Sequence, residues 1–370
     1  MVAMKLSAAL AVLASVCAAV GCTKSHDVEA GFDFTPVEGS TAGLSFSCTE
    51  EIEDSLDGLP DRLSCTQLYS DFKTKKVAKG IREYSPAYAL WSDGAEKTRW
   101  IELPEGEKID ASNPRDWVFP VGTRAFKEFR RGDRRVETRL YEKMGSTTWS
   151  KATYTWDKSE SEATRNLGGK DLLVEGEPYY VPSGLDCNEC HRGSRDNLLG
   201  FDQISLGLPS ATGVTLQDLV DDDLLEGFDG PTTYEIGDDG SGVAAEVFGA
   251  IHINCGVSCH NGNPDSKGYS RGMRLVLDPE TLDGRDSSNF DIATTTIDEK
   301  GASVQWLNET RVIPGDPDAS LFFKLIAARG DQQMPPLATR IVDEDLVKAV
   351  RTWIESLPMS PEGGATSETE

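Results

Sequence analysis

Short segments in which apolar and polar side chains alternate run through the chain between residues 66 and 182. A repeat of two residues is the pattern of a β-strand with one buried face. The sequence Arg131-Gly132-Asp133 has the composition of a tight turn and joins two such segments. The clearest segments are residues 99–103, 124–129, 136–141 and 153–156. We therefore expect an antiparallel, sandwich-like, β-rich domain over residues 66–182.

The apolar repeat changes to that of α-helices towards the C-terminus. Residues 243–251 place their apolar side chains on one helical face, and the pair Asp316-Pro317 is suited to begin a helix that continues to residue 326. Asp343 is a candidate N-cap for a last helix whose apolar stripe ends at Leu357. A short helix is also expected over residues 216–225. The chain is therefore predicted to be α+β, with the β-rich domain followed by an all-α domain.

The first 22 residues have the features of a bacterial lipoprotein signal peptide. Lys5 precedes an apolar run over residues 6–21, and Gly21 stands directly before Cys22. The run is shorter than the ~20 residues needed to span a bilayer, and cleavage would leave Cys22 as a lipidated N-terminus that anchors the protein to a membrane. We expect a protein on the periplasmic side of the bacterial envelope, anchored in the outer rather than the inner membrane, or secreted.

Composition and motifs divide the rest of the chain. Residues 23–65 are expected to form a linker with a loop closed by two cysteines, and residues 358–370 a disordered tail. Residues 183–240 hold a first cysteine motif and an acidic region. Residues 241–357 form the expected helical domain.

The charge of the chain bears on its partners. The formal net charge is −25, which argues against nucleic acid and fits a basic protein partner. Residues 196–266 contain 13 Asp and Glu and no Lys or Arg. We interpret that segment as a solvated acidic face, with a docking surface for a basic redox partner or a Ca²⁺ site as alternatives.

Cys187-Asn188-Glu189-Cys190-His191 is a C-x-x-C-H sequence, the attachment signature of c-type haem. In such a site Cys187 and Cys190 bind the two vinyl groups of the porphyrin, and His191 is the proximal ligand to iron. A zinc half-site and a redox dithiol are the alternatives. The hairpin between residues 124 and 151 is locally basic. It is either a solvated sheet surface or a face towards the haem propionates.

Cys255, Cys259 and His260 form a second motif, C-x-x-x-C-H, which is one residue longer. On a helix, positions i and i+4 share a face, so both thiols can reach one porphyrin edge. Met334 stands before two prolines and is the candidate distal ligand. It could instead be a core methionine, and a Cys255–Cys259 disulfide would have poor geometry.

The remaining two cysteines beyond the signal peptide are Cys48 and Cys65. In an exported chain they are expected to form a disulfide. The alternative is a pair of unpaired buried thiols.

The order of leading helix, second motif, long loop, short helix, Met-Pro-Pro and closing helix over residues 241–357 resembles the class I c-type cytochromes. Trp91-Ser92-Asp93-Gly94, Phe119-Pro120-Val121-Gly122-Thr123 and Pro182-Ser183 are similar to sequences in a family of exported di-haem c-type cytochromes with a β-rich N-terminal domain. The resemblance implies two haem c groups in an α+β protein and leaves the reaction open.

Two functions follow from these motifs. We expect an electron-transfer protein with two covalently bound haems, and the alternative is a di-haem peroxidase or oxidase in which the first haem is reactive. The sixth ligand of the first haem distinguishes them. His252 is the spare histidine, and it is either this ligand or a histidine that is merely packed. Met144 and Met273 are weaker candidates, and an open site would suit an enzyme. A ligand-binding role of the tryptophans in the β-rich domain is compatible with both.

Overall fold

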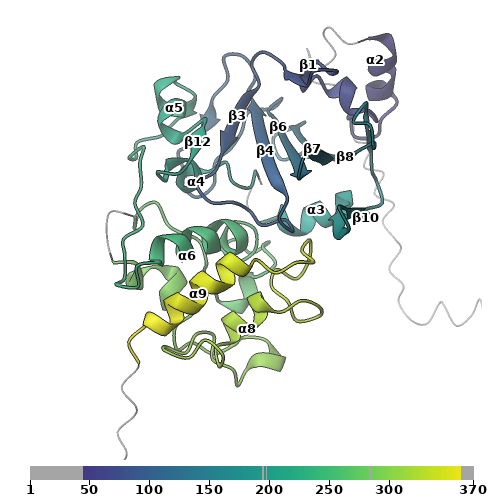
Figure 1. Cartoon of the computed structure of the whole chain (residues 1–370). Helices are drawn as coiled ribbons and strands as arrows, with labels where there is room; N and C mark the ends of the chain where they lie inside the picture. Colours follow the sequence, from purple (N-terminus) through teal and green to yellow (C-terminus); the bar gives the residue numbers. More distant parts are fainter. Residues whose placement is uncertain (1–44, 194–195, 197, 283–285, 360–370) are drawn as a thin grey trace, which may run out of the picture. The chain divides into compact units, whose positions relative to one another are not determined.

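A seven-stranded antiparallel sheet organises the N-terminal half of the chain (Figure 1). The structure is a computed structural model, and it describes residues 45–193, 196, 198–282 and 286–359. Predictions on the signal peptide, Cys22 and residues 360–370 lie outside the described residues. The strand order is β12-β3-β4-β6-β7-β8-β9. The strands are β3 (Arg82–Ser85), β4 (Glu96–Glu102), β6 (Arg124–Arg131), β7 (Arg134–Lys143), β8 (Trp149–Trp156), β9 (Ala163–Arg165) and β12 (Thr212–Gly213).

Three small two-stranded sheets accompany the large one: antiparallel β1–β2 and β10–β11, and parallel β5–β13. Their strands are β1 (Tyr69–Asp71), β2 (Lys76–Val77), β5 (Ile109–Asp110), β10 (Lys170–Val174), β11 (Glu177–Val181) and β13 (Leu225–Glu226). The α-helices are α2 (Phe46–Glu53), α3 (Gly184–Cys190), α4 (Gln203–Gly207), α5 (Leu216–Asp221), α6 (Ala244–Ile251), α7 (Asp291–Thr294), α8 (Leu321–Ala327) and α9 (Glu344–Ser356). Other helical turns are η1 (Leu63–Thr66), η2 (His252–Gly256), η3 (Tyr269–Arg271), η4 (Ser287–Asn289) and η5 (Val304–Trp306).

The two faces of the large sheet differ in chemistry. Trp100, Phe126 and Leu140 are neighbours in register on one face, where they pack in a core cluster with Leu59 and Leu63 of the preceding segment. Successive residues of a strand point to opposite faces, so the other face carries the residues between them. That second face holds the side chains nearest the first motif.

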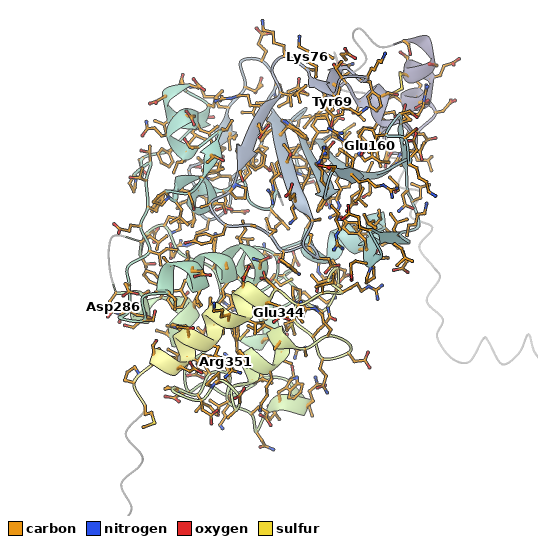
Figure 2. The ribbon with its side chains drawn as sticks, in the orientation of Figure 1. Tyr69, Lys76, Glu160, Asp286, Glu344 and Arg351 are labelled. Atoms are coloured by element: carbon orange, nitrogen blue, oxygen red, sulfur yellow. A yellow bond between two sulfur atoms is a disulfide. The ribbon has the colours of Figure 1, made fainter. Side chains whose placement is uncertain are left out.

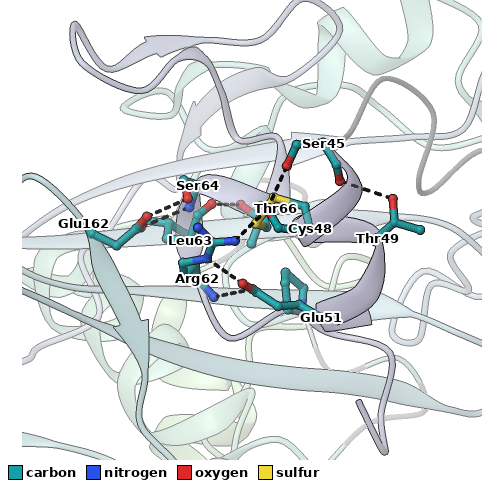
Figure 3. The surroundings of a disulfide bond; sticks show 12 residues. Ser45, Cys48, Thr49, Glu51, Arg62, Leu63, Ser64, Thr66 and Glu162 are labelled. Carbon is teal, nitrogen blue, oxygen red and sulfur yellow. Dashed lines mark hydrogen bonds and ion pairs between the residues drawn. A yellow bond between two sulfur atoms is a disulfide. The ribbon is translucent and has the colours of Figure 1, made fainter. Parts of the chain in front are cut away.

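The Cys48–Cys65 disulfide is present, with a Cα–Cα distance of 5.2 Å (Figure 3). Two polar contacts hold the segment around it, the first within the segment and the second to Glu162 beside β9. Arg62 Nε donates to Glu51 Oε1 at 2.5 Å, and Ser64 Oγ donates to Glu162 Oε2 at 2.6 Å (Figure 3). The predicted disulfide is confirmed, and residues 45–66 are held to the end of the sheet rather than forming a free linker.

One hydrophobic cluster joins the sheet to the C-terminal helices. It contains Tyr84 and Ile101 from the sheet, Val247 from α6, Phe322 from α8 and Trp353 from α9. The predicted mixed α+β class is therefore confirmed. In the part of the chain that the structure describes, no helix is long and apolar enough to cross a membrane.

Two predicted helix boundaries are wrong. The helix expected to begin at Asp316 starts at Leu321, because Asp316 Oδ1 accepts the Ala319 N–H and closes a turn instead. The helix expected over residues 216–225 ends at Asp221, since Leu225 pairs with Ile109 in β13. The last helix begins as predicted, with the Asp343 carboxylate accepting the Leu346 N–H.

Candidate functional site

Every cysteine and histidine of the two motifs lines one cavity of about 390 Å³. Cavities of roughly 300–1,000 Å³ are typical of cofactor and ligand sites. The structure thus brings together two motifs that are far apart in the sequence. The motif residues in the lining are Cys187, Cys190, His191, Cys255, Cys259 and His260, and Met334 lies in the same cavity.

Helix α3 carries both cysteines of the first motif, and a capping box fixes where it begins. The Asp186 N–H donates to Ser183 Oγ at 3.3 Å, and the Ser183 N–H donates to Asp186 Oδ2 at 2.9 Å. Such a box satisfies two backbone donors that a helix start leaves free. Cys187 follows immediately and is buried, and Cys190 is half-buried at the end of the helix. Both thiols are unpaired.

The large sheet forms a wall of the first motif. The ring centre of His191 lies 4.6 Å from that of Tyr141 on β7. Lys151 Nζ on β8 donates to Asn188 Oδ1 at 2.8 Å. The sheet face opposite the apolar core therefore positions both the helix and its histidine.

The second motif lies on a turn that is wider than an α-helix. The Val257 N–H donates to the His252 carbonyl at 3.0 Å, and the His260 N–H donates to the Cys255 carbonyl at 2.9 Å. Both bonds span five residues, one more than in an α-helix. The α-helical geometry expected for this motif is therefore wrong. The π-type turn absorbs the extra residue, so that Cys255 and Cys259 reach one cavity while remaining unpaired.

Burial raises the pKa of two motif thiols. The pKa of Cys190 is raised to about 11 and that of Cys255 to about 12, by burial first and by the neighbouring Cys259 second. Reactive cysteines have lowered pKa values because their thiolates are stabilised. Cys190 and Cys255 are instead protonated at neutral pH.

His260 is buried with its Nδ1 atom lacking a hydrogen-bond partner. Burial, and after it the nearby cations Arg311, Arg271 and Arg274, lower its pKa to about 4. The imidazole is therefore neutral at neutral pH, which is the form that binds metals.

Gly268 packs against the His260 ring. A methyl group built on Gly268 would lie 2.7 Å from His260 Nδ1 and 2.7 Å from the Cys259 carbonyl oxygen. We expect Gly268→Ala to lower the free energy of unfolding by about 1–3 kcal/mol through overpacking, measured by urea denaturation. Gly262→Ala is the matched control, since nothing lies within 4 Å of a methyl group there. It should change the free energy by less than about 0.5 kcal/mol. An equally small change for Gly268→Ala would contradict the tight fit.

Residues that follow each motif lie against the other motif. A methyl group built on Gly193, two residues after His191, would lie 2.6 Å from the Ser258 carbonyl oxygen, inside the second motif. Lys267, seven residues after His260, forms an ion pair with Glu189 of the first motif. The two motifs are therefore close together.

Met334 lies in the loop between α8 and α9. Its side chain is 36% exposed, and its backbone N–H donates to the Leu325 carbonyl at 2.9 Å. Gln333 Nε2 donates to the carbonyls of Pro335 and Thr339 at 2.9 and 3.0 Å. The loop is thus bonded within itself, with the Met334 side chain at the cavity.

The Trp91-Ser92-Asp93-Gly94 sequence is hydrogen-bonded both to Asn254, beside the second motif, and to the loop that contains Met334. Sequence reasoning missed this role. The Trp91 N–H donates to Asn254 Oδ1 at 2.7 Å, directly before the second motif, and Trp91 Nε1 donates to the Ile341 carbonyl at 2.9 Å. Oδ1 of the buried Asp93 accepts the N–H groups of Arg340 and Ile341 at 2.8 and 2.9 Å. The Asp-Gly pair signals a turn in the sequence. Its partners lie 247 and 248 positions away, beyond any local pattern.

The structure does not bring His252 into the cavity of the motifs. Its Nδ1 accepts the Leu277 N–H at 3.0 Å, and its Nε2 lies 3.7 Å from Asp202 Oδ1 in a second cavity. Met273 lines the cavity of the motifs, whereas Met144 is not among its lining residues. Of the two weaker candidates, Met273 is thus the one that lies in this cavity.

Asp196, an acid close in sequence to the first motif, is fully engaged elsewhere. It forms a buried ion pair with Lys143. It also accepts the Phe119 N–H at 2.7 Å and the Trp149 Nε1–H at 2.9 Å. Its contacts fasten the chain after His191 to the sheet.

The residues present fit covalently bound haem. Each motif has two thiols that form no disulfide and a histidine directly after the second thiol. The other two described cysteines form a disulfide with each other. The His260 ring is neutral, and a thioether lies in the same cavity. Thiols, imidazole and thioether are the donor set of c-type haem sites. Among the described residues, no group of three or more His, Cys, Asp and Glu side chains is arranged to hold a metal ion.

Comparison of the chain with protein-family models, with curated proteins and with solved structures finds no match.

Proposed function

We propose that the chain is a di-haem c-type cytochrome that transfers electrons. The observation that carries the proposal is that both C-x-x-C-H-type motifs, with four unpaired thiols, line one cavity together with Met334. Four separate free thiols would be unusual in an oxidising compartment. Attachment of porphyrin vinyl groups accounts for all four.

Each motif residue has a role in this proposal. Cys187 and Cys190 hold the first haem and Cys255 and Cys259 the second. His191 and His260 are the proximal ligands, and Met334 is the distal ligand of the second haem. When bound, each haem supplies a one-electron iron couple, and a methionine ligand raises its potential. Adjacent motifs favour electron transfer between the two sites, because tunnelling weakens steeply with distance.

The helical part supports a finer assignment. The order α6, second motif, α8, Met334 loop and α9 agrees with a class I cytochrome c-like domain over residues 241–357. The sheet belongs to the sandwich-like, β-rich domain of an exported di-haem family. Both assignments are part of the proposal.

Location and partners complete the proposal. The Cys48–Cys65 disulfide fits an oxidising compartment on the periplasmic side of a bacterial envelope, where Cys22 would carry the lipid anchor. The net charge of −25 fits a basic redox partner and not nucleic acid. A peroxidase or oxidase remains the alternative function, with the first haem as its reactive centre.

A haem count tests the proposal. We expect two haems per chain in a pyridine haemochrome assay. Cys187→Ser/Cys190→Ser and Cys255→Ser/Cys259→Ser should each lose one covalently bound haem and retain the other. One haem per chain in the unaltered protein would contradict the second site. A high-spin ferric EPR signal that responds to peroxide would overturn the carrier role in favour of the enzyme.

A further inference from the structure

Three cations stand side by side on the sheet face that borders the first motif. Arg99 on β4 pairs in register with Lys127 on β6, and Lys127 pairs with Arg139 on β7. Like charges directly opposite each other on a sheet are destabilising. We call Arg99, Lys127 and Arg139 the cation row.

The cation row is partly buried. Lys127 and Arg139 are half-buried and line the cavity of the motifs. Arg99 is not among the lining residues; it is 3% exposed, and its Nε and Nη2 atoms have no hydrogen-bond partner. Burial and the neighbouring cations, including Lys97, lower the pKa of Lys127 well below its usual value. A buried charge without a partner costs several kcal/mol.

Only one member of the cation row has a carboxylate partner. Glu137 binds Arg139 at 2.6 Å and accepts the Tyr179 hydroxyl at 2.7 Å. Asp93 is used by the two backbone N–H groups of the Met334 loop, and Asp343 caps α9. Arg99 and Lys127 are left without a carboxylate partner among the described residues.

Aromatic contacts are too weak to compensate. Arg139 lies 4.3 Å and Lys127 5.3 Å from the centre of the Phe129 ring. Such contacts contribute about 0.5–2 kcal/mol each, less than the several kcal/mol that burial costs each ion. The described part of the polypeptide therefore does not compensate for the cost of burying these charges. Anionic oxygens of a bound group would do so.

We infer that the cation row is a carboxylate-binding site and that it takes the propionates of the haem attached at Cys187 and Cys190. The inference rests on the proposed function. Arg139 and Lys127 line the same cavity as Cys187 and Cys190, which places the row beside the attachment point. A guanidinium can bind a carboxylate through two parallel hydrogen bonds, and Lys127 has no carboxylate partner among the described residues.

The test follows the reduction potential of the first haem between pH 5 and 8 in the holoprotein. A propionate paired with cations stays ionised over this range, so the potential of the unaltered protein should be constant. In Lys127→Gln the propionate should titrate, and the potential should fall as pH rises because the ionised propionate stabilises ferric iron. Arg99→Gln, which removes the cation paired in register with Lys127, should give the same profile where it folds. Lys127→Arg should restore the constant potential.

Lys76→Gln is the control, because it removes the same charge from an exposed side chain on β2 (Figure 2). It should leave the profile constant. If both Arg99→Gln and Lys127→Gln carry two haems per chain and keep a potential that does not change with pH, the inference is overturned while the proposed function stands. Fewer than two haems in the unaltered protein would overturn the proposed function.

A second arm distinguishes propionates from an exchangeable anion. Acetate and inorganic phosphate are titrated into the unaltered holoprotein while its absorption spectrum and potential are followed. We expect no saturable change, since the row is already occupied. A saturable change that is absent from Arg99→Gln would show an exchangeable anion site and overturn the assignment to propionates.

Discussion

Lys143→Met is expected to lower the free energy of unfolding by about 3–5 kcal/mol, the cost of breaking a buried ion pair by removing one partner. The side chains of Lys143 and Asp196 are 1% and 0% exposed. Without the ammonium group, the Asp196 carboxylate stays buried with two neutral donors, Phe119 N–H and Trp149 Nε1–H. Methionine keeps most of the volume of the lysine stem, so the loss reports on the charge. Urea denaturation measures it.

Two further variants isolate the ion pair. Lys76→Met removes an exposed lysine and should change the free energy by less than about 0.5 kcal/mol. Lys143→Met/Asp196→Asn removes both charges and should recover much of the stability, because no unpaired ion remains. A loss under 1 kcal/mol in Lys143→Met would show that Asp196 is not buried as described. Because Asp196 follows His191 by five residues, the same loss should loosen the first motif.

Asp93→Gly is expected to release the Met334 loop. Asp93 has a φ of 52°, a left-handed conformation that glycine adopts without strain, so the substitution removes the carboxylate alone. Hydrogen bonds to charged groups contribute about 1.5–3 kcal/mol each. Because Arg340 is exposed, we take the lower value of this range for each of the two bonds, which gives a loss of about 3 kcal/mol. That loss corresponds to a roughly 100-fold larger open population of the loop.

The readout is the long-wavelength absorption band of methionine bound to ferric iron, followed against temperature. In Asp93→Gly the band should disappear at a lower temperature than in the unaltered protein, with the haem count unchanged. Asp93→Asn keeps an acceptor oxygen and tolerates the same φ, so it should lie between the two. Met334→Ala should lack the band at all temperatures. An unchanged band in Asp93→Gly would disprove the link between Asp93 and the loop.

Local patterns identified much of the fold. The alternating segments between residues 99 and 156 coincide with parts of β4, β6, β7 and β8, the first extending one residue beyond β4, and the predicted turn at Arg131-Gly132-Asp133 joins β6 to β7. Strand alternation and helix periodicity depend on neighbouring residues, so they can be read from short windows. The start of the helix at Leu321 was missed because the Asp316 side chain closes a turn as readily as it caps a helix.

The environment of the site could be predicted only in part. Residue spacing predicted both motifs and Met334, and all of them line one cavity. Their surroundings depend on long-range contacts that no spacing contains. Asp93 binds backbone groups 247 and 248 positions away, and Gly193 meets Ser258 through the packing of two separate segments. The wide turn at Cys255 is a third case. An extra residue in a motif does not determine whether the backbone will form an α-helical or a π-type turn there.

The position of the disulfide along the chain affects which cysteines can pair wrongly during folding. Six thiols can be fully paired in 15 ways, and in an exported chain only one pair should be oxidised while four stay available. Cys48 and Cys65 are separated by 17 positions and precede the other four. In the exported protein that we propose, they would meet during N-to-C passage across a membrane before Cys187 emerges. Early closure of this short loop would withdraw two thiols from mispairing, so that the order of the cysteines along the chain would protect the later four.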